Sequence, residues 1–217
     1  MPHQPVEDGG RPLRASARRA GRATSPLKLF VVTGPSGAGK GTLIRGLVER
    51  RRDLKVAVSA TTRPRRQGER DGREYYFLSD EEFDAKVRAG AFLEHVVFVG
   101  GRYGTLNAEV DRILESGRGC ILELETDGAH RVKHLRPDAV TIFIAPPSFA
   151  ELERRLRERA TESAGEIGER LDLARRQMEE AGEFDYVVTN DDVDRAISEL
   201  DAIITRESKG VGTLAQP

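Results

Sequence analysis

The stretch LFVVTGPSGAGKGT, residues 29–42, decides the fold. Its first five residues are apolar or β-branched and end at a glycine, which is typical of a buried strand. From Gly34 to Lys40 the spacing is G-x-x-x-x-G-K, a loop whose backbone N–H groups converge on a phosphate chain while the lysine adds a positive charge. The positions that follow share one apolar helical face: Leu43, Ile44, Leu47 and Val48. A helix N-terminus therefore points at the same phosphates, and the stretch predicts binding of a nucleoside triphosphate.

One position departs from the usual form of this loop. The residue after the lysine is usually Ser or Thr, whose hydroxyl ligates Mg²⁺, whereas this chain has Gly41 and only then Thr42. We expect Thr42 to hydrogen-bond a phosphate, and Mg²⁺, bound with ATP, to rely on water and on the oxygens of the nucleotide. No residue is assigned as a direct metal ligand. The predicted ATP-binding residues of the loop are Gly34, Pro35, Ser36, Gly37, Ala38, Gly39, Lys40, Gly41 and Thr42.

Length and composition exclude several classes of protein. The 217 residues suit one domain, or a core domain with small insertions. A net charge of −1 argues against a general nucleic-acid binder, because there is no global positive field. The single cysteine, Cys120, lies in an apolar run and leaves neither a disulfide nor a zinc site. No apolar run approaches membrane-spanning length, so we expect a cytoplasmic protein without a membrane or nucleic-acid partner.

The order of elements along the chain indicates an α/β domain with a mainly parallel sheet. Residues 1–26 are rich in Arg, Gly, Ala and Pro and predict a disordered extension, and 208–217 predict a flexible tail. Between them, strands are expected at 29–33, 55–60, 75–78, 91–99, 102–104, 119–125, 140–145 and 186–189. Helices are expected after Lys40, from Ser79, and at 106–116, 129–135, 148–159, 167–180 and 193–206.

Several separate motifs resemble the guanylate kinase family over residues 29–204. They are GPSGAGKGT (34–42), VSATTRPRRQGERDGREYYF (58–77), FLEH (92–95), GRYGT (101–105), LELETDG (122–128), FIAPPS (143–148), RRLRERAT (154–161) and TNDD (189–192). The resemblance implies a P-loop kinase fold with a central mainly parallel sheet flanked by helices, a small α+β GMP-binding insertion and a helical lid. It places the domain at 27–207, its core at 27–58 and 106–207, the insertion at 59–105 and the lid at 155–171. It also implies transfer of the γ-phosphoryl group of ATP to GMP, and to dGMP.

The resemblance assigns a basic, turn-rich segment to the phosphate of GMP. Arg63 and Arg66 lie there, and guanidinium groups suit bidentate binding of a terminal phosphate. Tyr75 can add a hydroxyl donor, and Tyr103 carries over as a further contact. Without the resemblance, two arginines in such a loop would be read as a solvated turn.

The same resemblance assigns four residues to the guanine base: Ser59, Glu94, Thr105 and Glu125. Guanine presents N1–H and the N2 amino group as adjacent donors, so a carboxylate can accept from both, whereas adenine has an acceptor at N1. Glu94 lies in an otherwise apolar run, where an unpartnered carboxylate would be costly. Glu125 departs from the family, which more often has Asp at this position.

The transferred phosphoryl group is expected among four cations: Lys40, Arg155, Arg159 and Arg170. Phosphoryl transfer spreads charge over equatorial oxygens, so catalysis is chiefly positioning and charge stabilisation, and no general base is needed. Asn190 follows the last strand and, by resemblance, contacts adenine.

Two other readings stay open on the residues alone. One is a non-catalytic guanylate-kinase-like module that binds a phosphorylated peptide, and the other is a P-loop kinase for a different small phosphorylated acceptor. The intact loop and the retained arginines argue against the first, and the carboxylates at 94 and 125 argue against the second. The sequence does not distinguish a monomer from a homodimer.

Overall fold

The computed structural model describes residues 28–98, 101–159 and 164–209. Its centre is a five-stranded sheet in the order β2-β7-β1-β8-β9, and every neighbouring pair is parallel. The strands are β1 (Leu29–Thr33), β2 (Leu54–Val56), β7 (Gly119–Glu123), β8 (Val140–Ala145) and β9 (Tyr186–Thr189). The fold class predicted from the sequence is confirmed, and β1, which leads into the phosphate loop (residues 34–40), is the central strand.

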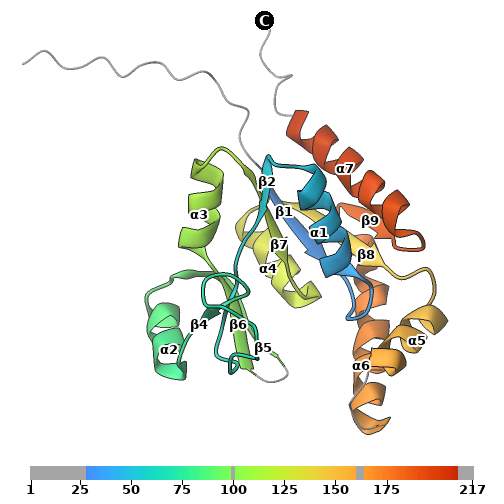
Figure 1. The fold of residues 1–217 in the computed structure, drawn as a ribbon, viewed down its shortest axis with the longest axis horizontal. Helices are drawn as coiled ribbons and strands as arrows, with labels where there is room; N and C mark the ends of the chain where they lie inside the picture. The colour runs from blue at the N-terminus through green and yellow to red at the C-terminus, as the bar shows by residue number, and fades with distance from the viewer. Residues whose placement is uncertain (1–27, 99–100, 160–163, 210–217) are drawn as a thin grey trace, which may run out of the picture.

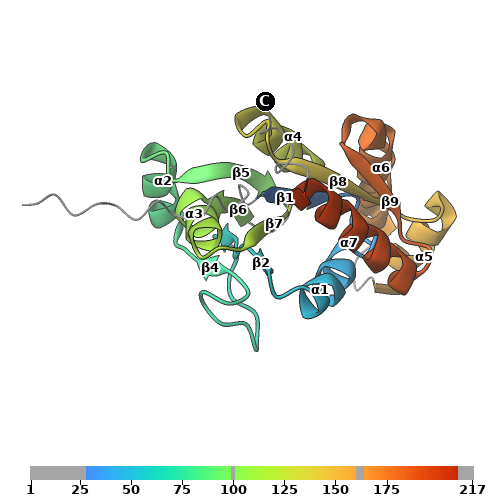
Figure 2. The same cartoon turned by 90° about the horizontal axis from the view of Figure 1, so that it is seen from above.

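Helices cover both faces of this sheet. Strand β1 is buried at all five positions, and its side chains alternate between two cores. Phe30 and Val32 pack with α1 (Lys40–Arg50) and α7 (Val193–Lys209), while Leu29 and Val31 pack on the other face with α3 (Asn107–Glu115) and α4 (Thr126–Leu135). Figure 2 shows α1 and α7 on one side of the sheet and α4 on the opposite side. Packing on both faces fixes β1 in the middle of the sheet. Its carboxyl end, where the phosphate loop begins, lies among the carboxyl ends of the other strands.

A second, smaller sheet is inserted between β2 and α3. Its order is β4-β3-β6-β5, and it consists of β3 (Ala60–Thr61), β4 (Tyr76–Phe77), β5 (Phe92–Phe98) and β6 (Gly101–Leu106). Helix α2 (Asp80–Arg88) lies between β4 and β5 in the chain. It begins at the expected residue, because Ser79 and Glu82 form a reciprocal capping box.

Two further helices lie on the other side of the phosphate loop from the second sheet (Figure 1). They are α5 (Phe149–Arg159) and α6 (Ala164–Glu179), and a short 3₁₀ turn, η1 (Glu180–Glu183), follows. The Ser148 hydroxyl caps α5 by accepting from the Glu151 N–H at 3.1 Å. Leu152 and Leu156 of α5 pack on Leu171 and Ala174 of α6 in a separate small core.

Some expected boundaries are wrong. Residues 55–60 do not form one strand, because the chain changes sheets there: the Ala57 N–H donates to Ile121 in the first sheet, and the Ser59 carbonyl accepts from Tyr76 in the second. Helix α4 begins at Thr126 rather than 129, and α7 continues to Lys209, into the tail expected from 208. The predictions for residues 1–26 and 210–217 concern residues outside the described ranges. Within the described ranges, no helix is long and apolar enough to span a membrane.

Candidate active site

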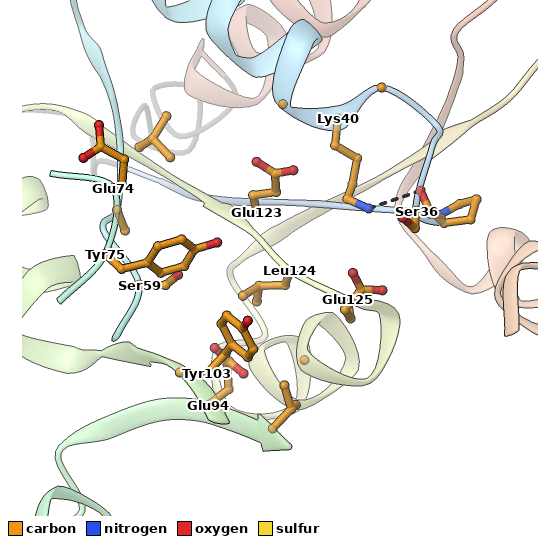
Figure 3. Close-up of a pocket in the computed structure, with 18 of the residues that line it drawn as sticks. Ser36, Lys40, Ser59, Glu74, Tyr75, Glu94, Tyr103, Glu123, Leu124 and Glu125 are labelled. Atoms are coloured by element: carbon orange, nitrogen blue, oxygen red, sulfur yellow. Dashed lines mark hydrogen bonds between the residues drawn. The ribbon is translucent and has the colours of Figure 1, made fainter. Parts of the chain in front are cut away.

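A cleft of about 680 Å³ joins the phosphate loop to the second sheet (Figure 3). It opens at the carboxyl ends of β1 and β7, where open parallel sheets bind ligands. Its lining includes these residues predicted to bind ATP or GMP: Pro35, Ser36, Gly37, Gly39, Lys40, Gly41, Thr42, Ser59, Tyr75, Glu94, Tyr103 and Glu125. Two groups of residues, assigned separately to a triphosphate and to a nucleoside monophosphate, therefore meet in one cavity.

Neighbouring atoms force the glycines of the phosphate loop. Gly34 has φ +135°, and a Cβ there would lie 2.3 Å from the Ile144 carbonyl oxygen. Gly39 has φ +95°, and a Cβ there would lie 2.3 Å from Nδ2 of Asn190. Only glycine tolerates both the positive φ and the close approach. The loop consequently runs tight against β8 and leads directly into α1, whose first residue is Lys40.

Lys40 is held inside the phosphate loop. Its side chain is nearly buried, with 8% of the residue exposed, and its ammonium group donates to the carbonyl oxygens of Gly34 and, at 3.3 Å, Pro35. A buried ammonium needs such acceptors to offset its lost hydration. These contacts place the cation at the N-terminus of α1, beside the backbone amides of the loop.

The far end of the cleft contains a buried carboxylate. Glu94 is 6% exposed, and its Oε1 accepts a hydrogen bond from Thr105 Oγ1 at 2.8 Å. The pair faces across β5 and β6, where Glu94 and Thr105 are register partners. A Cβ on Gly128 would lie 3.3 Å from Glu94 Oε2, so α4 approaches the carboxylate closely. Burial raises the pKa of Glu94, against the opposing effects of the Thr105 hydrogen bonds and the charge of Arg131.

Glu125, the second carboxylate predicted to contact the base, is hydrogen-bonded to a residue of α6. Its Oε2 accepts a hydrogen bond from Nε2 of Gln177 at 2.9 Å, and Gln177 is 4% exposed. Glu125 is also the N-cap residue of α4, although its side chain does not cap the helix. Its position as a contact to guanine stays a prediction.

The residues predicted to bind the GMP phosphate are only partly brought together. The rings of Tyr75 and Tyr103 lie 5.9 Å apart, and burial raises the pKa of Tyr75. The Arg63 guanidinium lies 5.4 Å from the Tyr75 ring centroid, but it forms an ion pair with Glu69 at 2.7 Å. Arg66 is exposed, and its backbone N–H donates to the same Glu69 carboxylate. Neither arginine lines the cleft.

The arginines predicted to surround the transferred phosphoryl group lie on α5 and α6. Arg155 forms an ion pair with Glu151 at 2.8 Å and does not line the cleft. Arg154 and Arg155 together hold the pKa of the Glu151 carboxyl down to about 2. Arg170 lies closer to the phosphate loop, with its Nη2 3.5 Å from Ser36 Oγ. Arg159 ends α5, and its side chain lies outside the described structure, as do residues 160–163 of the predicted lid.

Asn190 supports the phosphate loop directly. It is 4% exposed, and its Nδ2 donates to the Ala38 carbonyl at 2.7 Å. Asp192 directly precedes α7, and its side chain accepts from the Arg195 N–H at 2.9 Å. Asn190 does not line the cleft, and its contact with adenine stays a prediction.

Glu123 is a further carboxylate in the cleft, and it was not predicted as a site residue from the sequence. It ends β7, lines the cleft, and lies opposite Gly41, where an added Cβ would be 3.7 Å from its Oε2. Protein atoms crowd the cleft around Glu123 and raise the pKa of its carboxyl, while Lys40 acts in the opposite direction, although solvent still reaches the side chain. The sequence carries a signal for this residue, because the apolar run of β7 ends in Glu123. P-loop NTPases use an acidic residue outside the loop to hold Mg²⁺.

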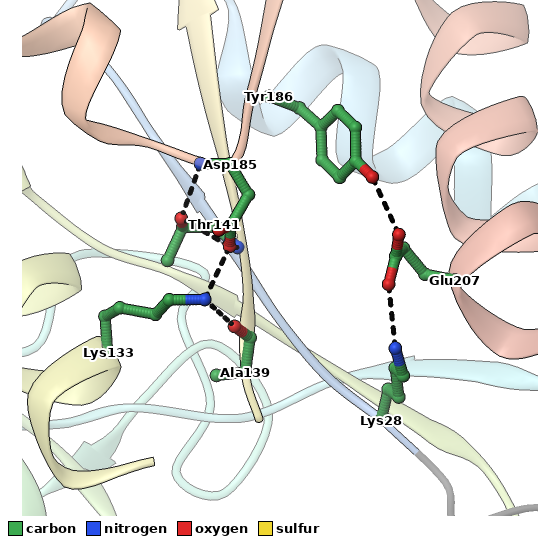
Figure 4. A network of polar contacts seen from close by, with 7 residues as sticks. All are labelled: Lys28, Lys133, Ala139, Thr141, Asp185, Tyr186 and Glu207. Atoms are coloured by element: carbon green, nitrogen blue, oxygen red, sulfur yellow. Dashed lines mark hydrogen bonds and ion pairs between the residues drawn. The ribbon is translucent and has the colours of Figure 1, made fainter. Parts of the chain in front are cut away.

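A second cavity, of about 270 Å³, lies at the amino ends of β1, β8 and β9. Figure 4 shows four of its charged side chains in two ion pairs. Lys133 and Thr141 donate to Asp185, and Lys28 and Tyr186 donate to Glu207. This network ties α4 and α7 to the sheet.

Comparisons with known proteins agree with this geometry. The family model for guanylate kinase matches residues 27–207. A guanylate kinase from Parasynechococcus marenigrum is 49% identical over 176 residues, covering 81% of this chain and 97% of the relative. One from Frankia casuarinae is 47% identical over 179 residues, covering 82% and 97%. The crystal structure of guanylate kinase from Anaplasma phagocytophilum superposes with a TM-score of 0.70 at 28% identity, covering 85% of this chain and 87% of that one. The chain belongs to the guanylate kinase family.

Proposed function

We propose that the protein transfers the γ-phosphoryl group of ATP to the phosphate of GMP and releases ADP and GDP. The observation that carries this proposal is the buried Glu94 carboxylate at the end of a cleft that begins at the phosphate loop. A buried carboxylate with a raised pKa needs ligand donors to compensate it, and guanine supplies two adjacent ones. The family match supports the same activity.

Guanine is read by acceptors that are already in place. Thr105 donates to Oε1 of Glu94 and so fixes the plane of the carboxylate, which accepts from N1–H and the N2 amino group of the base. Ser59 and Glu125 complete the set around the base. Adenine places an acceptor at N1 against the same carboxylate, so Glu94 keeps only the Thr105 hydrogen bond and gains no donor from the base. None of these four residues is assigned to the ribose, so we expect dGMP to be a substrate as well.

Phosphates at both ends of the cleft recruit arginines that now pair with acidic residues. The phosphate of GMP replaces Glu69 as the partner of Arg63, and Arg66, Tyr75 and Tyr103 join it. The γ-phosphate likewise draws Arg155 from Glu151. In each case an arginine leaves a carboxylate and pairs with a phosphate in the cleft. We expect these new ion pairs to draw the second sheet and the α5–α6 pair toward the phosphate loop.

The phosphoryl group then passes between two bound nucleotides with little covalent chemistry left to the protein. The amides of residues 34–42 and Lys40 hold the triphosphate, and Asn190 stabilises the loop and the adenine side. Arg155, Arg159 and Arg170 stabilise the charge on the equatorial oxygens. The GMP phosphate needs no general base, because it is largely ionised near neutral pH. Closure excludes water, which suppresses hydrolysis of ATP.

The residues around Gly41 fit a magnesium ion that binds with ATP. The described residues contain no cluster of His, Cys, Asp and Glu that could hold a metal by itself, so phosphate oxygens must provide ligands. Glu123 faces the position where related loops have a Ser or Thr hydroxyl, and we assign it as the protein oxygen on that side. When bound, Mg²⁺ neutralises charge on the β- and γ-phosphates. Thr42 hydrogen-bonds a phosphate.

An assay of ADP release with Mg²⁺-ATP and one nucleoside monophosphate at a time tests this function. We expect kcat/KM for GMP to exceed that for AMP by a factor on the order of 10⁴, because the buried carboxylate rejects a base that lacks the two donors. Comparable use of AMP, or no use of GMP, would contradict the proposal. The assay also excludes a binding module without catalytic activity.

A further inference from the structure

Gln177 lies outside the cleft but contacts a carboxylate inside it. Its Nε2 donates to Glu125 Oε2 at 2.9 Å, and its side chain is buried. The two residues are 52 positions apart, on α6 and at the start of α4. A buried amide is costly unless its hydrogen bonds are made, so this contact is a built part of the fold rather than a chance surface contact.

The chemistry of the pair suits the orientation of an acceptor. A glutamate has three rotatable side-chain bonds, and fixing it on ligand binding costs conformational entropy on the order of 1.5–2 kcal/mol. The amide of Gln177 already holds one oxygen of Glu125, which leaves Oε1 to accept from a ligand. The Gln177 amide is a neutral donor, so it orients Glu125 and leaves the negative charge that attracts a ligand donor. A lysine at this position would cancel that charge.

Gln177 also shares a helix face with a predicted catalytic arginine. Gln177 and Arg170 are seven residues apart, which is close to two turns, so both side chains leave α6 on the same side, about 10 Å apart along the axis. Between them lies Ala174, which is 2% exposed and packs on α5. One end of this face reaches Ser36 of the phosphate loop, and the other reaches Glu125.

We propose that Gln177 is a positioning residue for guanine recognition. It orients Glu125 toward the base and, through α6, links a correctly seated guanine to the placement of Arg170. The proposal rests on the proposed function, and in particular on the contact between Glu125 and guanine. It assigns a specificity role to a residue that does not touch the substrate.

The first test replaces the amide with an apolar side chain of similar length, Gln177→Met. Loss of one charge-assisted hydrogen bond predicts a rise of about ten-fold in the KM for GMP, with the KM for ATP changed by less than about two-fold. Arg176→Met is the matched control, because Arg176 is an exposed neighbour on the same helix and should leave both constants unchanged. A folded Gln177→Met protein with an unchanged KM for GMP would overturn the proposal.

The second test measures how the KM for GMP depends on pH, rather than its value at one pH. In Gln177→Glu, the introduced carboxyl faces Glu125: at low pH the introduced carboxyl keeps a proton and donates to Glu125, and at higher pH it ionises and repels the Glu125 carboxylate. The KM for GMP should therefore rise with pH in this variant relative to wild type. Glu123 on β7 also acts on Glu125 electrostatically, but that effect is common to both proteins. A difference that does not vary with pH would overturn the proposal.

A paired exchange separates positioning from a purely structural hydrogen bond. The double variant Glu125→Gln with Gln177→Glu restores a hydrogen bond between the two side chains but reverses its direction. Positioning predicts that thermal stability recovers while the KM for GMP stays raised. Recovery of both the thermal stability and the wild-type KM for GMP would show that the hydrogen bond has a structural role only, and would overturn the proposal. Failure of the proposed function is recognised separately, because the wild-type protein would then not phosphorylate GMP at all.

Discussion

Replacing Glu94 with glutamine removes one charge and exchanges one acceptor oxygen for an amide donor, while it keeps the size of the side chain. Thr105 can still donate to Oε1 of the glutamine, as it does to Glu94 at 2.8 Å in the native protein. The substitution therefore weakens only the hydrogen bonds with the guanine base. Hydrogen bonds to a charged group contribute about 1.5–3 kcal/mol each, and the new amide N–H₂ opposes a donor of guanine. A loss of about 3 kcal/mol lowers kcat/KM for GMP by a factor of about 10².

The same substitution should stabilise the unliganded protein. Burial raises the pKa of Glu94 above its ordinary value of 4.5, so the native state binds this proton more tightly than the unfolded state. The free energy of unfolding therefore falls as pH rises from about 4.5 through the raised pKa, and the penalty is fully present above it. Glu94→Gln removes that penalty, so its stability advantage should be largest at neutral pH and should shrink toward pH 4.5.

Steady-state kinetics and urea unfolding between neutral pH and about pH 4.5 measure both effects. Glu74→Gln is the control, since Glu74 is another carboxylate that lines the cleft and we assign it no contact with the base. A KM for GMP within about two-fold of wild type would refute Glu94 as the reader of guanine. A variant that is less stable than wild type at neutral pH would refute the account of its raised pKa.

Three further outcomes are expected. Lys40→Met should lower kcat by about 10²-fold or more with little change in melting temperature, and near-normal turnover would rule out its role at the phosphates. Asn190→Leu should raise the KM for ATP and reduce the free energy of unfolding by about 1–3 kcal/mol, because the buried Ala38 carbonyl loses its donor; an unchanged urea midpoint would argue otherwise. Glu123→Gln should raise the Mg²⁺ concentration for half-maximal rate by about ten-fold, whereas Glu74→Gln should not; superimposable titrations would exclude Glu123 as a ligand.

Features set by local sequence could be predicted well. The central strand, the glycines of the phosphate loop and the helix starts at Ser79 and Ser148 depend on residues within one or two turns of one another. The family motifs also located Glu94 and Thr105, which the structure brings into direct contact. Periodicity could not show that the chain leaves one sheet at Ala57 and enters another at Ala60, because the partner strands are distant in sequence.

The contacts that hold the site residues in place were beyond the sequence for the same reason. Gln177 reaches Glu125 across 52 residues, and Asn190 reaches Ala38 across 152. Sequence spacing also could not show that Glu69 already occupies Arg63, so a phosphate must compete for that arginine. Residue types and motif spacing predict which groups meet a ligand, while tertiary packing decides which other groups orient them.

The most direct test of the account is a crystal structure of the protein with GMP bound. We predict the guanine N1–H and N2 amino group within hydrogen-bond distance of the Glu94 carboxylate. The phosphate should lie near Tyr75, with Arg63 released from Glu69 and paired with the phosphate. A base that lies away from Glu94 and Glu125 would contradict the assignment of this end of the cleft to guanine.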